Sequence, residues 1–546
     1  MAGGLLTFQC GVLFVAVCVG DASGTTYAHN RLVWVEQAGT PLDDRSADLH
    51  CYTDGSSLAV GTRLGHFDPA DLGDKEPPFF GPADAFAIKR SATGEVLWAK
   101  TTAIGLSDQV VTFYPEDDDS RASFLEDGRF AHCGVFHTEA TFGPGDPNET
   151  TLSYPAGWHG YVASHNADGT LNWVRGIESS YEPEVNVLMY MAAVALAPDG
   201  TCYAIATNPE SAAFCEGAST IPPTFAFVCY DADGNCNWVR NLDRVFSTPD
   251  TYQKIVFSNG VIALTDTLDC FSRYGALVWT NPDFSHRGAI CSVPGTDDFI
   301  VVRNPNWYFG QEHTLQKWTS SAQCIWTVTL PRPPVPSDVD VTARPDGSGY
   351  VLMCPGSDSE PFCVIPFSSD GALGTTSNLD LIARPVAQWC DIDVLPGEDA
   401  FLLSGVFSES HTFASGQPHE TTLTSHGQAD HFLAKYRMAF LYYLDVDVIG
   451  RGNIALTPPG QFYWSDTPVT LRAAPNFPNH DAFVEWQGDF PGTDPEFTVS
   501  LSQDSHVTAV FEEIPGAPPL PALSLAGLAV LAVGLAAAGL LQREHK

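Results

Sequence analysis

The stretch His159–Arg175, HGYVASHNADGTLNWVR, contains the clearest copy of a unit that recurs along the chain. Its first half alternates apolar and polar residues, a short polar turn ends at Gly169, and Trp173 follows four residues later. Period-two alternation on both sides of a glycine turn predicts two antiparallel strands joined as a hairpin. The same pattern occurs in Asp84–Lys100, DAFAIKRSATGEVLWAK, and in Thr224–Arg240, TFAFVCYDADGNCNWVR. The chain is therefore expected to be an all-β repeat protein.

Seven strands of this kind are expected before the hairpin turns. They read DAFAIKR, HGYVASH, TFAFVCY, LDCFSRY, HTLQKWT, PFCVIPF and DHFLAKY, beginning at Asp84, His159, Thr224, Leu268, His313, Pro361 and Asp430. Strands carrying a tryptophan are expected around Trp34, Trp98, Trp173, Trp238, Trp279 and Trp326. Seven further strands are expected after turns such as Asp-Gly or Asn-Gly. Two distant units, Gly134–Ala163 and Gly405–Ala434, match closely enough to indicate duplication.

The last unit has no Trp strand of its own, whereas the chain begins with an unpartnered one, RLVWVEQAG. In a closed ring the N-terminal strand can complete the last unit and cover an exposed sheet edge. We therefore predict a seven-bladed β-propeller over residues 32–440. An open solenoid is the alternative, but it would leave the N-terminal strand unpaired.

These repeats resemble the bacterial seven-bladed propeller repeat family, whose units read "DAFVAKYDSSGNLQW…DGNVYVTGxF". The matching residues are Asp84–Phe86, Asp430–Tyr436 and the hairpins that lead into tryptophan. The resemblance covers about three quarters of the chain. It implies an extracellular propeller, and it implies no single activity.

Residues 441–513 have a different character, with short expected strands between Gly and Pro turns. Four motifs occur in order: Gly450–Pro458, Val469–Pro475 (VTLRAAP), Phe483–Asp489 (FVEWQGD) and Val507–Phe511 (VTAVF). They resemble the bacterial surface repeat related to the internalin B-repeat. That resemblance implies a small, mostly β, non-catalytic surface module.

Both ends of the chain predict export and anchoring. Residues 1–24 resemble a signal peptide, although no Lys or Arg precedes the apolar run. Residues 514–521 form a Pro-rich linker, and 522–541 are twenty uncharged residues, long enough as a helix to cross a bilayer. A short basic tail, 542–546, follows. The arrangement resembles bacterial C-terminal sorting signals, in which a protease can cleave near the Pro motif; whether the helix is kept or cleaved stays open.

The charge balance excludes one class of partner. The chain has 26 Lys and Arg against 65 Asp and Glu, a net charge of −39. Nucleic acid and anionic lipid surfaces attract basic proteins, so neither is expected as a partner. The expected partner is a protein or glycan at the cell surface, and membrane contact is expected only through the C-terminal helix.

Candidate cysteine and metal sites are few. Fourteen cysteines occur without zinc-type spacing. A hairpin turning at Ala232-Asp233 would place Cys229 opposite Cys236, which makes this pair the candidate disulfide; the alternative is that both are small buried hydrophobes.

No cofactor is expected, and calcium is considered only at two acidic segments. Asp231–Gly234 resembles part of a calcium loop, but Asn166–Gly169 and Ser369–Gly371 occupy the same place in their units, which favours a hairpin turn. Glu116–Asp119 could hold a divalent cation, but an exposed acidic loop is the favoured interpretation.

No catalytic residue is predicted, because the chain has no GxSxG, HExxH or P-loop motif. SATGEVLW, Ser91–Trp98, resembles the repeat of quinone-dependent dehydrogenases, which have eight blades. Six histidines in matching excursions are expected in surface loops: His159, His165, His411, His419, His426 and His431.

The favoured hypothesis is a secreted, membrane-anchored bacterial surface protein. It would display a propeller for binding, adhesion or envelope organisation, without catalysis. The alternative is an extracellular propeller enzyme, either a quinone-dependent dehydrogenase or an enzyme acting on polysaccharide. Such an enzyme would need a convergent polar cluster at the central channel.

Overall fold

The computed structural model describes residues 27–41, 45–63, 65–67, 69–72, 75, 77, 84–105, 122–179, 190–208, 212–213, 224–241, 254–258, 260–264, 267–281, 288–303, 313–331, 336–355, 361–382, 390–415, 419–427, 429–465 and 467–517. The chain divides into two compact units, His29–Met438 and the remainder. The predicted signal peptide, 1–24, and the predicted membrane helix, 522–541, lie outside the described residues. Among those residues, no helix has the length and apolar character needed to span a membrane.

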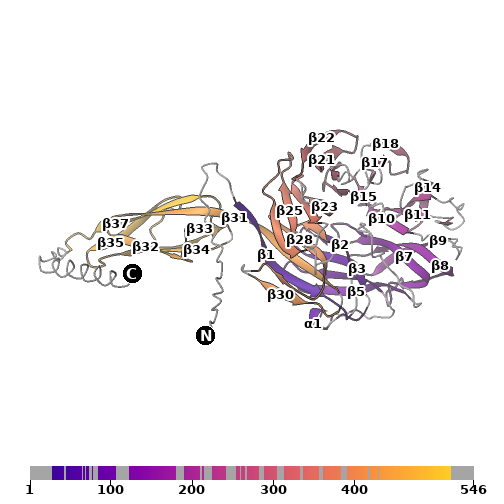
Figure 1. The fold of residues 1–546 in the computed structure, drawn as a ribbon, viewed down its shortest axis with the longest axis horizontal. Coiled ribbons are helices and arrows are strands. Elements are labelled where there is room, and N and C mark those ends of the chain that lie inside the picture. The colour runs from indigo at the N-terminus through magenta and orange to yellow at the C-terminus, as the bar shows by residue number, and fades with distance from the viewer. Residues whose placement is uncertain are drawn as a thin grey trace, which may run out of the picture. The chain divides into compact units, whose positions relative to one another are not determined.

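The first unit consists of antiparallel sheets that follow one another along the chain (Figure 1). Apart from β12, β29 and β30, its described strands follow one another in groups of four, and the first two groups are joined into one sheet because β5 pairs with β7. The first three groups are β2 (Arg45–Cys51), β3 (Ser57–Arg63), β4 (Asp84–Arg90), β5 (Val96–Gly105); β6 (Ala122–Phe124), β7 (Phe130–Phe142), β8 (Thr150–His165), β9 (Leu171–Ser179); and β10 (Tyr190–Leu196), β11 (Cys202–Asn208), β13 (Thr224–Tyr230), β14 (Cys236–Asn241). The short strand β12 (Ala212–Ala213) pairs with β9, and a short helix, α1 (Pro69–Leu72), lies between β3 and β4.

The remaining groups repeat this order. They are β15 (Lys254–Phe257), β16 (Val261–Leu264), β17 (Leu268–Phe271), β18 (Leu277–Asn281); β19 (Ala289–Ser292), β20 (Asp298–Arg303), β21 (Thr314–Thr319), β22 (Cys324–Thr329); β23 (Pro336–Ala343), β24 (Gly349–Pro355), β25 (Pro361–Phe367), β26 (Ser377–Ile382); and β27 (Asp391–Val394), β28 (Ala400–Phe407), β31 (Asp430–Ile449), β1 (Tyr27–Ala38). A separate hairpin joins β29 (Ser410–Phe413) and β30 (Thr421–Thr424).

The first strand of each group contacts the first strand of the next, and β27 contacts β2, so these strands close a ring. Sheets arranged radially around a common channel define a β-propeller. The pairing of β1 with β31 places the N-terminal strand at the outer edge of the last group. The predicted strands that begin at Asp84, Thr224 and Pro361 are confirmed as β4, β13 and β25.

One contact recurs between neighbouring groups. A tryptophan on the outer strand donates its indole N–H to a backbone carbonyl in the hairpin turn of the next group. The pairs are Trp34 to Ala92 (3.2 Å), Trp173 to Ala232 (3.0 Å), Trp238 to Arg273 (3.3 Å), Trp279 to Ser320 (2.8 Å) and Trp326 to Ser369 (3.1 Å). The first of these joins β1 of the last group to the β4–β5 turn of the first group. The chain therefore closes the ring with the same contact that joins its consecutive sheets.

In four of these five turns a glycine leaves room for the tryptophan ring. Gly234 has φ +78°, and a Cβ at this position would lie 2.6 Å from Cδ2 of Trp173. Gly94 against Trp34, and Gly275 against Trp238, have the same arrangement. Both the left-handed backbone and the ring contact therefore favour glycine here.

The Asp of the turns stabilises the backbone locally. Asp168 accepts a hydrogen bond from the N–H of Thr170 at 3.0 Å, and Asp199 accepts one from Thr201 at 3.0 Å. Asp231 accepts hydrogen bonds from Asp233 and Asn235 at 3.0 and 2.8 Å. These are side-chain turns of the kind that Asp favours. The carboxylate of Asp231, the residue that resembled a calcium ligand, is thus engaged by its own hairpin.

The predicted disulfide between Cys229 and Cys236 is wrong. Cys229 lies opposite Trp238 and is a buried free thiol, whereas Cys236 lies opposite Tyr230 and is disulfide-bonded elsewhere. The hairpin turn spans Asp231–Asn235, closed by a hydrogen bond from the N–H of Asp231 to the carbonyl of Asn235, so Cys236 pairs with Tyr230 and not with Cys229. Since side chains alternate between faces, this register puts the two sulfur atoms out of reach.

The expectation of surface histidines is also wrong for four of the six. His159, His165 and His431 are 0–2% exposed and lie on β8 and β31, and His411 is 9% exposed on β29. Each of these four side chains is buried within a strand, whereas the polar residues around it predicted an exposed loop. His419 and His426 lie outside the strands.

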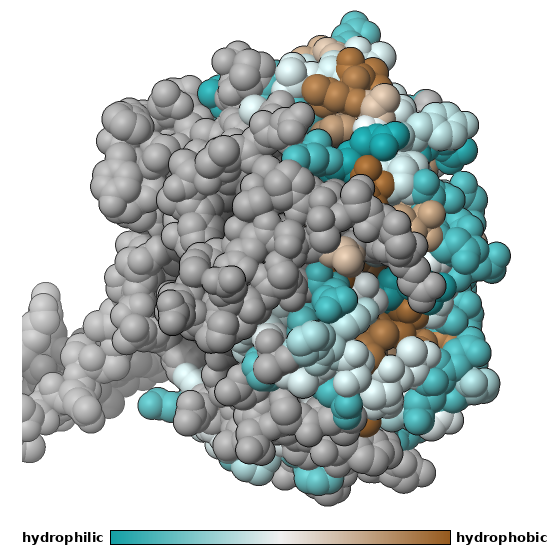
Figure 2. Space-filling view, turned by 90° about the vertical axis from the view of Figure 1, so that its right-hand side faces the viewer, coloured by the Kyte–Doolittle hydropathy of each residue, from teal (hydrophilic) through white to brown (hydrophobic). Residues whose placement is uncertain are grey.

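Figure 2 shows one face of the molecule, on which hydrophobic residues lie in separate spots between hydrophilic ones. Large apolar side chains are exposed in the outer strands, for example Leu97, Leu277 and Ile325. They belong to three different groups of strands, β5, β18 and β22. Isolated exposed apolar residues of this kind are ordinary for a protein surface.

The second unit is also built of strands. Its parallel pair joins Leu444–Ile449 of β31 to β37 (Ser505–Glu513), and β35 (Asp481–Gly488) continues this sheet beside β37. A second sheet has the order β32 (Gly452–Thr457), β34 (Val469–Pro475), β36 (Glu496–Val499), and β33 (Phe462–Trp464) pairs with β31. Alternate residues of these strands pack around the buried Trp486.

Candidate ligand-binding channel

The innermost strands of the first unit surround a cavity of about 830 Å³. Every group of strands contributes to its wall: β2, β6, β10, β15, β19, β23 and β27 all provide lining residues. Pockets of 300–1,000 Å³ are typical of small-molecule sites. The cavity therefore has the size of a ligand-binding site and lies in the channel of the ring.

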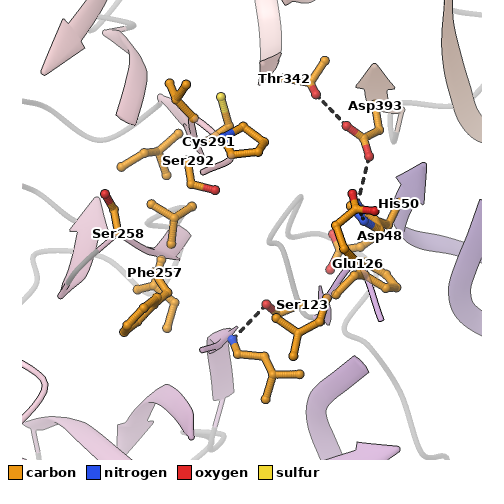
Figure 3. A pocket seen from close by; sticks show the side chains of 18 of the residues that line it. Asp48, His50, Ser123, Glu126, Phe257, Ser258, Cys291, Ser292, Thr342 and Asp393 are labelled. Atoms are coloured by element: carbon orange, nitrogen blue, oxygen red, sulfur yellow. Dashed lines mark hydrogen bonds and ion pairs between the residues drawn. The ribbon is translucent and has the colours of Figure 1, made fainter. Parts of the chain in front are cut away.

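One wall of the cavity carries a charged cluster from three consecutive groups (Figure 3). His50 of β2 lies between Asp393 of β27, with Nδ1 to Oδ2 at 3.1 Å, and Glu126, with Nε2 to Oε1 at 3.6 Å. The imidazole stacks on Phe124 with ring centroids 5.5 Å apart. The histidine therefore links the first group to both of its neighbours.

The two carboxylates keep His50 charged. Burial favours the neutral ring, but the carboxylates of Asp393 and Glu126 outweigh it and raise the pKa of His50 to about 9. The interaction with His50 in turn lowers the pKa of Glu126. At neutral pH the cluster is thus an imidazolium between two carboxylates. An imidazolium cannot accept a proton, so His50 is not suited to act as a general base.

The acidic side chains of the channel also hold neighbouring sheets together. An innermost strand is a sheet edge, so its outer N–H groups have no partner within the sheet. Carboxylate or hydroxyl oxygens of the adjacent group accept them: Asp340 from Ile392 (3.1 Å), Asp391 from Leu49 (2.6 Å), Asp393 from Cys51 (2.8 Å), Asp48 from Ala122, and Ser123 from Leu196 (2.9 Å). Oδ1 of Asp393 also accepts the hydroxyl of Thr342 at 2.6 Å. These polar residues therefore have a structural role in the ring.

The opposite wall is mainly apolar. Figure 3 shows Phe257, Ser258, Cys291 and Ser292 across the cavity from His50 and Asp393. Ser258 is buried, and its Oγ has no hydrogen-bond partner among the described residues. A ligand in this cavity would therefore meet hydrogen-bonding groups on one side and apolar side chains with isolated hydroxyls on the other.

No residue of this cluster was singled out from the sequence. The polar residues of the innermost strands alternate, as Asp48 and His50, Asp340 and Thr342, and Asp391 and Asp393. Each pair precedes a hairpin turn. The alternation of polar residues in these otherwise apolar strands was therefore the sequence signal that could have indicated the channel wall. The acidic run Glu116–Asp119 lies outside the described residues.

Comparisons with known proteins add only distant likenesses. No family model matches the chain, and no curated protein matches it. Three solved structures to which this chain is similar serve as examples. They are a europium-containing methanol dehydrogenase (10% identity, 75% of this chain and 93% of that chain, TM-score 0.40), the quinohemoprotein alcohol dehydrogenase of Comamonas testosteroni (10%, 75% and 76%, 0.35) and the Dos1 propeller (10%, 74% and 95%, 0.37). At these values the likenesses carry no argument about activity.

Proposed function

We propose that this chain is a non-catalytic binding protein whose propeller takes a small ligand into its central channel. The observation that supports this proposal is the cavity of about 830 Å³, with a charged wall around His50 facing an apolar wall. The charged groups are already engaged with one another and with backbone N–H groups. They suit recognition better than proton transfer, which requires a group that changes its protonation state near neutral pH.

The proposal includes a seven-bladed architecture closed by the N-terminal strand. Each group of four strands would be one blade, and β1 would complete the blade of β27, β28 and β31. The recurring contact from tryptophan to the next turn supports this interpretation, since Trp34 makes it across the closure. Residues 441–513 would be a surface-repeat module of the internalin B-repeat type.

We propose further that the protein is secreted and anchored at the cell surface. Support comes from the apolar segment 522–541, the Pro-rich linker before it and the net charge of −39. Membrane fractionation of the native host, with the intact mass of the mature protein, tests this location. A soluble cytoplasmic full-length form would contradict it.

The channel is tested by blocking it. Full-length protein and the variant Ser292→Trp are screened by thermal shift against a library of oligosaccharides and small metabolites, and hits are measured by calorimetry. Ser292 lies on the channel wall, so an indole there should weaken binding at least tenfold. The matched control is Ser321→Trp, in the exposed turn between β21 and β22.

Two results would overturn the proposal. Binding that is unchanged in Ser292→Trp would place the contact on the outer surface of the propeller. Conversion of a hit into a product, followed by NMR, would show an enzyme, which is the alternative function.

A further inference from the structure

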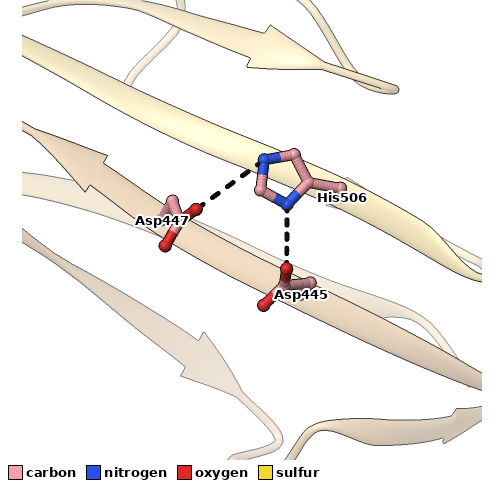
Figure 4. Close-up of side chains that lie close together, drawn as sticks. All are labelled: Asp445, Asp447 and His506. Atoms are coloured by element: carbon pink, nitrogen blue, oxygen red, sulfur yellow. Dashed lines mark hydrogen bonds and ion pairs between the residues drawn. The ribbon is translucent and has the colours of Figure 1, made fainter.

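Three side chains with metal-ligating atoms converge on the second unit, far in sequence from the channel residues (Figure 4). Asp445 and Asp447 lie two residues apart on β31, so their side chains point to the same face of the sheet. His506 lies on the neighbouring parallel strand β37, directly opposite Asp445. One ligand atom from each residue lies within 4.8 Å of the others.

The imidazole is oriented as a metal ligand requires. Nδ1 of His506 lies 3.1 Å from Oδ2 of Asp445, and Nε2 lies 3.1 Å from the hydroxyl of Thr508. Two ligand atoms bound to one tetrahedral Zn²⁺ at about 2.0–2.2 Å are themselves about 3.3–3.6 Å apart, slightly more than the separation here. A ligating histidine usually donates its other ring N–H to a nearby oxygen, which fixes the ring. Thr508 is placed to accept that hydrogen bond.

We propose that Asp445, Asp447 and His506 form a binding site for a divalent transition-metal ion, with Zn²⁺ as the best-suited ion. Nδ1 of His506 and a carboxylate oxygen of Asp445 are the first two ligands. Asp447 lies beside the other ring nitrogen, with Oδ2 3.9 Å from Nε2, and its side chain is 69% exposed, so it can turn toward the ion and supply the third ligand. One imidazole with two carboxylates is a donor set that zinc accepts, and water completes the tetrahedron.

The donor set favours zinc over calcium. Calcium requires six to eight oxygen ligands, whereas this site offers one nitrogen and two carboxylates on a rigid sheet. The same contacts without metal form a surface cluster in which the two ring nitrogens of His506 face two aspartates. That arrangement contributes little to stability, because exposed ion pairs are weak. The two interpretations therefore differ in zinc affinity.

The test compares metal binding by the full-length protein and matched variants. ZnCl₂ is titrated calorimetrically into wild type, His506→Gln, Asp447→Asn and the control Glu512→Gln, an exposed acid on the same strand β37. We expect wild type and Glu512→Gln to bind one zinc ion that His506→Gln lacks, and Asp447→Asn to bind it at least tenfold more weakly. Cobalt(II) should give visible absorption with low-symmetry coordination in wild type that is lost in His506→Gln.

Equal zinc binding by all four proteins would overturn the proposal, as would calcium binding that excludes zinc. The side chains of His506, Asp445 and Asp447 are about half exposed or more, so variants at these positions are expected to fold. Circular dichroism without metal checks this. If His506→Gln is misfolded, Asp445→Asn provides the same comparison, and undiminished zinc binding by that variant would equally refute the site.

Discussion

Substituting Gly234 with alanine tests whether the contact between tryptophan and turn stabilises the propeller. Gly234 has φ +78°, and the added Cβ would lie 2.6 Å from Cδ2 and 2.7 Å from Cγ of Trp173. A residue with a side chain costs about 1–2 kcal/mol in this left-handed conformation. The methyl group must also displace a ring that is 5% exposed, and overpacking of this kind costs about 1–3 kcal/mol.

The displaced ring would further weaken its hydrogen bond to Ala232, which contributes about 1 kcal/mol. We therefore expect Gly234→Ala to lower the free energy of unfolding by about 4 kcal/mol in total, from the backbone, packing and hydrogen-bond costs together. The matched control is Gly397→Ala: Gly397 has φ +81°, but a Cβ there meets nothing within 4 Å. Only the backbone cost of about 1–2 kcal/mol should remain in the control.

Urea unfolding followed by circular dichroism measures both variants. A double-mutant cycle with Trp173→Leu isolates the ring contact, because Gly234→Ala should cost no more than the control once the indole is absent. Two results would refute the inference that this contact stabilises the propeller. Either Gly234→Ala and Gly397→Ala destabilise the protein equally, or Gly234→Ala costs as much in the Trp173→Leu background as in the wild type.

Three further predictions follow from individual residues. Ala322 occupies the turn position that is glycine in other groups and has φ +67°; Ala322→Gly should raise the free energy of unfolding by about 0.5–1 kcal/mol in urea titrations, and a loss of stability would contradict this. Burial lowers the pKa of His165 to about 4, below its unfolded value of about 6.5. The stability that the neutral ring contributes is therefore full above pH 6.5 and is lost as the pH falls toward 4, by about 2 kcal/mol at pH 5. In unfolding measured from pH 7 to 5, His165→Gln should show a weaker dependence of the free energy of unfolding on pH than the wild type. His50 has a raised pKa of about 9, so its contribution is full below pH 6.5 and is lost as the pH rises through 9; thermal unfolding should show this alkaline loss, and a His50→Gln variant with the same pH dependence as wild type would contradict it.

Strands with both a period-two pattern and a turn signal could be predicted from the sequence. The segments DAFAIKR and TFAFVCY coincide with β4 and β13, because each combines alternation with an Asp or Gly turn that follows at a fixed distance. The expectation that the N-terminal Trp strand pairs with the last group followed from counting hairpins, and β1 does pair with β31.

The channel could not be predicted in the same way. Its lining strands include β15 and β19. Each has only four residues, and no Gly-containing hairpin turn directly precedes it in the sequence. His50 meets Asp393 only because the ring closes, and even its contact with Glu126 joins two different groups of strands, so the cluster depends on contacts between residues far apart in the sequence. The disulfide prediction failed for a local reason, since the turn spans Asp231–Asn235 and therefore pairs Cys236 with Tyr230 instead of Cys229.

The pairing of β1 with β31 has a consequence for biogenesis. The first strand to leave the ribosome or the export channel is the last to find its partner, because β31 is synthesised only after all the other groups. Long-range pairing of this kind is slow, and an unpaired edge strand can be captured by a second molecule. At high concentration, nascent or refolding chains should therefore exchange their N-terminal strands and form domain-swapped dimers.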